Sequence, residues 1–145
     1  MVGGESERLT ALLNVHSYFS LGAGTASPTT LVRRAAELGY RYLALTDDLN
    51  VTGAVELFQA AREHGVQALI GATVPVTVGD GAYPFVLIAR SREGYAGICR
   101  LITAALARSE RVATLSELLE HNHDVTLLTG PRDGVVARLL AQRRV

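Results

Sequence analysis

Two short polar stretches, each directly after an apolar run, contain side chains that can bind metal ions or transfer protons. In the first, the apolar residues 12–15 lead to His16 and a polar turn. In the second, the apolar residues 43–45 lead through Thr46 to the neighbouring carboxylates Asp47 and Asp48. Imidazole and carboxylate groups are common ligands of divalent metal ions in proteins. The two stretches therefore point to a shared site for metal binding or acid–base chemistry.

Both apolar runs have the length and composition of a β-strand, so the polar residues fall at strand ends. Ligands of α/β sheets bind just beyond the carboxyl ends of the parallel strands. We therefore expect Asn14 and His16 from the first strand to meet Asp47 and Asp48 from the second. The next strand along the chain adds only the hydroxyl of Thr73.

Residue chemistry alone leaves more than one interpretation of this group open. It is either the start of a divalent metal site, which normally needs three or more ligands, or a structural cluster. In a structural cluster, His16 and Asp47 would hold neighbouring loops through hydrogen bonds. A small α/β ligand-binding domain that uses the same cleft is a further alternative. No Gly-x-Gly-x-x-Gly or Gly-Lys-Ser/Thr loop is present, which disfavours the common forms of nucleotide binding.

The first half of the chain predicts two helices that alternate with strands. Ser27 and Pro28 are typical of a helix start, and Gly39 is typical of the residue just after a helix end. Thr52 is expected to cap a second helix, which Gly65 ends. This order predicts parallel strands joined by right-handed crossovers.

The second half predicts a β-hairpin followed by helices and one more strand. Residues 79–81 (GDG) are strong turn formers between strands at 68–78 and 83–89. Pro75 and Pro84 are expected at an edge or at strand starts, because proline cannot donate to a ladder. Further elements are predicted at 93–109 (helix), 114–120 (helix, with a capping box of Thr114 and Glu117), 125–129 (strand) and 135–142 (helix).

Composition bounds the class of protein. A chain of 145 residues with 48% hydrophobic and 19% charged residues fits one globular domain. A net charge of +0 gives no argument for a nucleic-acid-binding surface. The single cysteine, Cys99, rules out an internal disulfide and fits a reducing compartment. No apolar run approaches membrane-spanning length, so we expect a cytoplasmic protein without a membrane partner.

Several segments together resemble the PHP domain at the N-terminus of bacterial replicative DNA polymerases, the DNA polymerase III α subunit and its error-prone relatives. The resemblance covers about residues 12–140 and is carried by residues 15–21 (VHSYFSL), 26–28 (ASP), 35–40 (AAELGY), 44–47 (ALTD), Asn50, 53–55 (GAV), 65–71, 94–95 (GY) and 99–102 (CRLI). It implies a distorted (β/α)7 barrel. In intact members it also implies a phosphoesterase-type metal cluster at the carboxyl ends of the strands.

This sequence departs from the family at the ligand positions. The His-x-His motif reads NVH at residues 14–16, and Ala23 replaces an acidic residue of the following loop. Thr-Asp-His reads TDD at 46–48, and Gly-x-Glu reads GAT at 71–73. Of the five matching ligand positions only His16 is unchanged, and Asp48 is a chemically workable substitute. The resemblance therefore implies a vestigial metal site of His16 and Asp48, with Asn14, Asp47 and Thr73 lining the cleft and no catalytic residue.

The fold class expected is α/β: a partial PHP-type (β/α)7 barrel with mostly parallel strands, outer helices and one β-hairpin. Residues 1–10 are expected to be a flexible N-terminus and residues 11–145 a PHP-like domain, the N-terminal part of the barrel. The chain stops after a helix that should pack beside another strand, which is why the barrel is expected to be partial. The predicted core consists of Leu45, Leu57, Phe58, Leu69, Ile70, Val86, Leu101 and Leu127.

The function implied by the resemblance is that of a catalytically inactive, structural or interaction module of a DNA polymerase III α-like protein in replication or repair. The alternative is a metal-dependent phosphoesterase, of the phosphatase or 3′-end nuclease type, with a reduced ligand set. No cofactor is expected beyond a weakly held single Zn²⁺ or Mn²⁺. The expected partner is the remainder of a polymerase chain, or a partner chain that completes the barrel, with a homodimer as another option and DNA contacted only indirectly.

Overall fold

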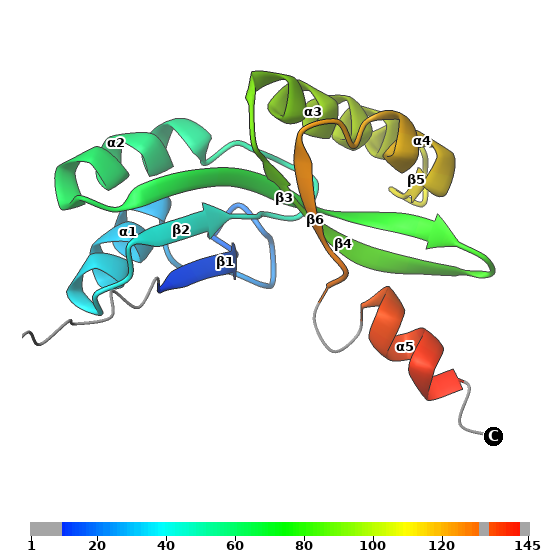
Figure 1. Ribbon diagram of the computed structural model, residues 1–145, viewed down its shortest axis with the longest axis horizontal. Coiled ribbons are helices and arrows are strands. Elements are labelled where there is room, and N and C mark those ends of the chain that lie inside the picture. Colours follow the sequence, from blue (N-terminus) through cyan, green and yellow to red (C-terminus); the bar gives the residue numbers. More distant parts are fainter. Residues whose placement is uncertain (1–9, 131–133, 143–145) are drawn as a thin grey trace, which may run out of the picture.

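A computed structural model describes residues 10–130 and 134–142 (Figure 1). The elements in chain order are β1 (Ala11–Val15), α1 (Pro28–Glu37), β2 (Tyr42–Leu45), α2 (Ala54–His64), β3 (Gln67–Val78), β4 (Gly81–Ala89), α3 (Arg92–Leu106), β5 (Ala113–Thr114), α4 (Leu115–Glu120), β6 (Val125–Leu128) and α5 (Val135–Gln142). Apart from Thr10, the N-terminal segment expected to be flexible lies outside the described residues.

One mixed sheet runs through the molecule in the order β1-β2-β3-β4-β6, with the short β5 beside β3. The first three strands are parallel and adjacent, as predicted, and β3 and β4 form the predicted antiparallel hairpin. The long strand β3 links the two halves, because its start pairs with β2 and residues 71–78 pair with β4. At this change of partner, a Cβ on Gly71 would lie 2.2 Å from the Leu87 carbonyl oxygen, so only glycine fits. The predicted α/β class is confirmed.

The helices pack against the sheet in two separate cores. In the first, α1 and α2 cover β1, β2 and the start of β3 through buried residues such as Val32, Leu43 and Leu57. In the second, α3 and α4 cover β3 and β4 around Leu87 and Leu101. Figure 1 shows the α1/α2 pair and the α3/α4 pair towards opposite ends of the curved sheet. The strand ends that carry the polar residues lie where β3 passes from the first core to the second.

Local sequence signals explain most helix ends. The Ser27 hydroxyl accepts a hydrogen bond from the Thr30 amide at the start of α1, and Gly39 follows its end with a φ of 79°. The predicted capping box of Thr114 and Glu117 is present in α4. The prediction for Thr52 was wrong, since Gly53 is the N-cap residue of α2 and makes no side-chain capping bond.

Some core predictions were also wrong. Leu45, Leu57, Val86 and Leu101 are buried as predicted, whereas Phe58 is 47% exposed and Leu69, Ile70 and Leu127 are only half-buried. In α2 the inward stripe consists of Leu57, Ala60 and Ala61, and Phe58 lies about 100° around the helix from Leu57. Pro75 and Pro84 lie opposite each other in the hairpin, and within the described ranges neither has a ladder partner on the outer side of its strand, as predicted for edge positions. Two prolines fit this arrangement only at a non-hydrogen-bonded pair, where neither nitrogen must donate across the ladder.

Candidate functional site

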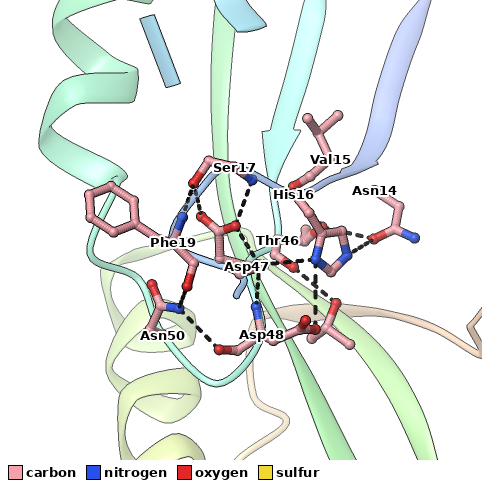
Figure 2. Close-up of polar contacts among 11 residues, drawn as sticks. Asn14, Val15, His16, Ser17, Phe19, Thr46, Asp47, Asp48 and Asn50 are labelled. Atoms are coloured by element: carbon pink, nitrogen blue, oxygen red, sulfur yellow. Dashed lines mark hydrogen bonds and ion pairs between the residues drawn. The ribbon is translucent and has the colours of Figure 1, made fainter. Parts of the chain in front are cut away.

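The carboxyl ends of β1 and β2 bring Asn14, His16, Asp47 and Asp48 into one polar cluster (Figure 2), and Thr73 joins it from within β3. Asn14 lies near the end of β1 and His16 directly follows it, while Asp47 and Asp48 follow β2 after Thr46. An isolated parallel bridge between Asp48 and Thr73 extends the pairing of β2 with β3 by a few residues. The parallel arrangement of these strands therefore assembles the site, as predicted from the two apolar runs.

Asp47 is the buried centre of the cluster. Its side chain is only 1% exposed and accepts three hydrogen bonds, from the Ser17 amide (2.7 Å), the Ser17 hydroxyl (2.7 Å) and the Ser20 hydroxyl (2.6 Å). These bonds stabilise the ionised carboxylate without a metal, because charge-assisted bonds of this length are strong. Asp47 therefore fastens the loop after β1 to the end of β2. This is the structural role that residue chemistry had left open.

His16 has contacts at both ring nitrogens. Nδ1 lies 3.1 Å from the Ser20 hydroxyl and 3.6 Å from an Asp48 carboxylate oxygen, and Nε2 lies 3.2 Å from the Asn14 amide oxygen. The Ser20 hydroxyl donates to Asp47 and the Asn14 amide oxygen accepts from Thr46, so both can act as acceptors towards the ring, and the tautomer decides which ring nitrogen donates.

Two of the neutral residues at ligand positions, Asn14 and Thr73, are hydrogen-bonded within the protein. The Asn14 amide oxygen accepts a bond of 2.9 Å from the Thr46 hydroxyl. The Thr73 hydroxyl, which is largely buried, donates a bond of 2.9 Å to the Thr46 carbonyl oxygen. Both side chains thus join neighbouring strand ends, and neither supplies a negative charge.

The Asn50 side chain holds the loop after β2 in place. Its amide nitrogen donates to the carbonyl oxygens of Phe19 (3.2 Å) and Asp48 (3.0 Å), and its amide oxygen accepts from the Thr52 amide (3.1 Å). This one side chain therefore links the loops that follow β1 and β2. The backbone next to it is unusual, because Leu49 has a φ of 53°.

The donor set does not fit the metal cluster that the family resemblance implies. Within the ranges that the structure describes, no three His, Cys, Asp or Glu side chains are arranged to hold a metal ion. His16 and Asp48 are the two donors that lie close together, and Ala23 has no donor atom. Two or three divalent ions need an anionic, multidentate shell, which Asn14 and Thr73 cannot provide.

Sequence reasoning missed the buried hydroxyls of Ser17, Ser20 and Thr46, which are each 0% exposed. They supply most of the donors that satisfy the site carboxylate and amide. A signal was present in the sequence, because two serines follow directly after a strand end within a polar turn. Their importance depends on the loop folding back over β2, which no local pattern specifies.

Solved structures with the same arrangement define the class of fold. A two-domain protein from Bacteroides vulgatus, which contains a predicted PHP-like metal-dependent phosphoesterase, matches 92% of this chain and 41% of its own with a TM-score of 0.60 and 15% identity. A candidate metal-dependent phosphoesterase from Bifidobacterium adolescentis matches 69% of this chain and 36% of its own with a TM-score of 0.56 and 25% identity. The fold is therefore that of the PHP-like phosphoesterases.

The family model of the PHP domain matches residues 13–144, and the chain belongs to this family. The error-prone DNA polymerase of Pseudomonas aeruginosa is 42% identical over 106 residues, which cover 72% of this chain and 10% of the polymerase. DNA polymerase III subunit alpha of Bacillus subtilis is 33% identical over 131 residues, which cover 88% and 12%. The chain thus spans about a tenth of the length of these relatives, and the resemblance seen in the sequence is confirmed.

No helix in the described ranges is both long and apolar enough to cross a membrane.

Proposed function

We propose that this chain is a non-catalytic PHP domain with a structural or interaction role in a bacterial protein of the DNA polymerase III α or error-prone type. It would act in DNA replication or repair, in the cytoplasm where DNA synthesis takes place, and would contact DNA only indirectly. The observation that carries the proposal is that the Asn14 and Thr73 side chains, at ligand positions of the family, are neutral and hydrogen-bonded to Thr46.

The physical argument concerns the activation of water. PHP-type phosphoesterase chemistry relies on clustered divalent ions that lower the pKa of bound water and stabilise the charge on phosphate. With His16 and Asp48 as the remaining pair of adjacent donors, the site offers at most a weak hold on a single Zn²⁺ or Mn²⁺. We infer that the cluster now serves to hold the first three strand ends together.

Metal analysis and a hydrolysis assay on the purified chain test the proposal. We expect substoichiometric zinc, manganese and iron, no hydrolysis of bis(p-nitrophenyl) phosphate above background, and no change of that background in His16→Ala. A matched positive control restores the family's ligands through Asn14→His, Ala23→Glu, Asp48→His and Thr73→Glu. The restored variant should hold more metal than the parent chain under identical loading.

A metal-dependent phosphoesterase with a reduced ligand set is the second candidate. It is favoured by the proximity of His16 and Asp48, whose side chains are 22% and 48% exposed and so accessible to an ion from solvent. Stoichiometric metal bound through these two residues, with hydrolysis abolished by His16→Ala, would establish this candidate and overturn the first.

The proposed partner is further polypeptide that completes the sheet. Strands β1 and β6 form the two ends of the strand order, and neither contains a charged residue that would discourage pairing. We propose that the remainder of a polymerase chain or a separate partner chain covers these edges, with a homodimer as the alternative. The much greater length of the polymerase relatives supports the first option.

A further inference from the structure

A groove of about 520 Å³ lies directly beside the polar cluster, between the loops after β1 and β2 and the C-terminal end of α3. We infer that this groove binds a short peptide segment of a partner protein, in which an apolar side chain stands next to a lysine or arginine. This inference rests on the proposed non-catalytic function, because it takes the groove as it is without a metal cluster. It goes beyond that function by specifying the chemical character of the partner segment that the groove binds.

The apolar part of the groove is unusually accessible. Leu21 is 95% exposed and Leu106 is 44% exposed, and they lie on separate elements at the groove. Leu49 and Pro75, which are half-buried, also line it. An incoming leucine or phenylalanine side chain would remove apolar surface of all four residues from water, which is the main favourable term in peptide binding.

The charges of the groove favour a cation over a phosphate. Asp48 and Glu110 line it with Arg111 as the one basic lining residue, and His16 Nδ1 lies 3.6 Å from the Asp48 carboxylate. Arg108 of the same turn pairs with Glu117 at 2.7 Å and also interacts electrostatically with Glu110. In metal-loaded relatives, bound cations would invert this local charge and attract phosphate. Without them, the carboxylates repel a phosphate ester and attract an ammonium or guanidinium group.

Two residues that line the groove have an energetically unfavourable backbone conformation. Leu49 and Arg111, both at the groove, have φ values of 53° and 55°, which non-glycine residues rarely adopt. The Leu49 amide donates to the Thr73 carbonyl oxygen at 2.9 Å, and the Asn50 side chain links the two loops of the wall. Such pre-organisation lowers the entropy cost of ordering the groove around a ligand.

A nuclear magnetic resonance titration of the ¹⁵N-labelled 145-residue chain tests the inference. The probes are the capped peptide Gly-Leu-Arg-Phe-Gly, the same peptide with glutamate in place of arginine, and a thymidine tetranucleotide. We expect saturable shifts of the Leu49, Asn50 and Arg111 amide signals with the arginine peptide. We expect at least about fivefold weaker binding of the glutamate peptide and no binding of the tetranucleotide.

Two variants and a control locate the binding. Glu110→Arg should weaken the arginine peptide about fivefold by removing one attraction and adding a repulsion. Leu106→Asp should abolish saturable binding, and Glu110→Arg keeps the test decisive if Leu106→Asp does not fold. The matched control is Glu63→Arg, the same charge change on the exposed surface of α2, which should leave the affinity unchanged.

The outcomes separate this inference from the proposed function. Binding of neither peptide, equal binding of both, preferential binding of the tetranucleotide, or insensitivity to Glu110→Arg would each overturn the groove inference. These results leave the proposed function intact when the same preparation is metal-poor and inactive. Hydrolysis that depends on a metal at His16 would instead overturn the proposed function, on a readout that does not involve the peptides.

Discussion

The Ser20 hydroxyl donates a hydrogen bond of 2.6 Å to the Asp47 carboxylate, and the two side chains are 0% and 1% exposed. The same hydroxyl oxygen accepts a bond of 2.9 Å from the Asp48 amide and lies 3.1 Å from His16 Nδ1. One serine therefore connects the carboxylate, the backbone and the imidazole of the site. The cluster therefore contributes to the stability of the folded chain, whether or not it binds a ligand.

Removing this connection should destabilise the chain. Ser20→Ala leaves a buried carboxylate with one donor fewer and should lower the free energy of unfolding by about 1–3 kcal/mol. Asp47→Ala should cost more, because it leaves Ser17 and Ser20 donors buried without an acceptor. Urea unfolding followed by circular dichroism measures both, with the exposed Gln59→Ala as the control. Equal midpoints for Ser20→Ala and Gln59→Ala would contradict the structural role.

The location of the site could be predicted from sequence, but the way its groups are satisfied could not. His16 and Asp48 meet because short apolar runs end at them and parallel strands share a carboxyl edge. The Ser17 and Ser20 bonds to Asp47 depend on a loop that returns across the strand ends. That path is set by tertiary packing and is not encoded in any residue spacing.

Two residues that differ in burial, one on β2 and one on α2, provide a paired test of core packing. Leu45→Ala on β2 should lower the free energy of unfolding by about 2–5 kcal/mol, because Leu45 is 5% exposed and packs in the first core. Phe58→Ala should cost less than about 1 kcal/mol, although it removes more atoms, since Phe58 is 47% exposed. Chemical denaturation of both variants measures the difference. The reverse order of midpoints would show that Phe58 belongs to the core after all.

The Phe58 result also shows where helical periodicity reaches its limit. Phe58 lies three residues before Ala61 and Ala60 lies three residues after Leu57, so both fit the i, i+3, i+4 spacing of one stripe. The packed core decides between them, because Leu57, Ala60 and Ala61 are the buried residues of α2 and belong to the first core. The sequence predicts which residues form the helix, but not which of several neighbouring residues faces the core.

The pairing of Arg108 and Glu117 predicts an acid-dependent loss of stability. The Arg108 guanidinium, followed by the Thr114 amide, lowers the pKa of the Glu117 carboxyl from 4.5 to about 2. The folded state therefore binds this proton less tightly than the unfolded chain. The resulting stabilisation is fully present above pH 4.5 and is lost as the pH falls towards about 2.

Thermal unfolding between pH 2 and 6 measures this contribution, and Glu117→Gln should remove it. The melting temperature of the parent chain should fall more steeply below pH 4.5 than that of the variant. Glu63→Gln, which removes an exposed carboxyl on α2, is the matched control and should keep the steep fall. Parallel curves for the parent chain and Glu117→Gln would refute the assignment.

Exposed apolar residues on α5 and β1 predict that the isolated chain associates. Val136, Leu139 and Leu140 on α5 are 48%, 44% and 63% exposed, and Leu13 on the edge strand β1 is 40% exposed. An uncovered apolar helix face and an uncharged sheet edge tend to pair with another polypeptide. Sedimentation velocity at increasing concentration should therefore show a dimer or higher species at micromolar levels.

A double substitution on α5 tests whether these side chains cause the association. Leu139→Glu with Leu140→Lys should shift the equilibrium towards monomer, because it replaces exposed apolar side chains on α5 with charged ones. The two substitutions together add no net charge. Val55→Glu with Phe58→Lys, the same change at exposed apolar residues of α2, is the control and should leave association unchanged. A parent chain that remains monomeric at micromolar concentration would exclude self-association. The proposal of a heterologous partner that completes the sheet would then remain, and sedimentation of the chain mixed with a polymerase segment from a relative would test it.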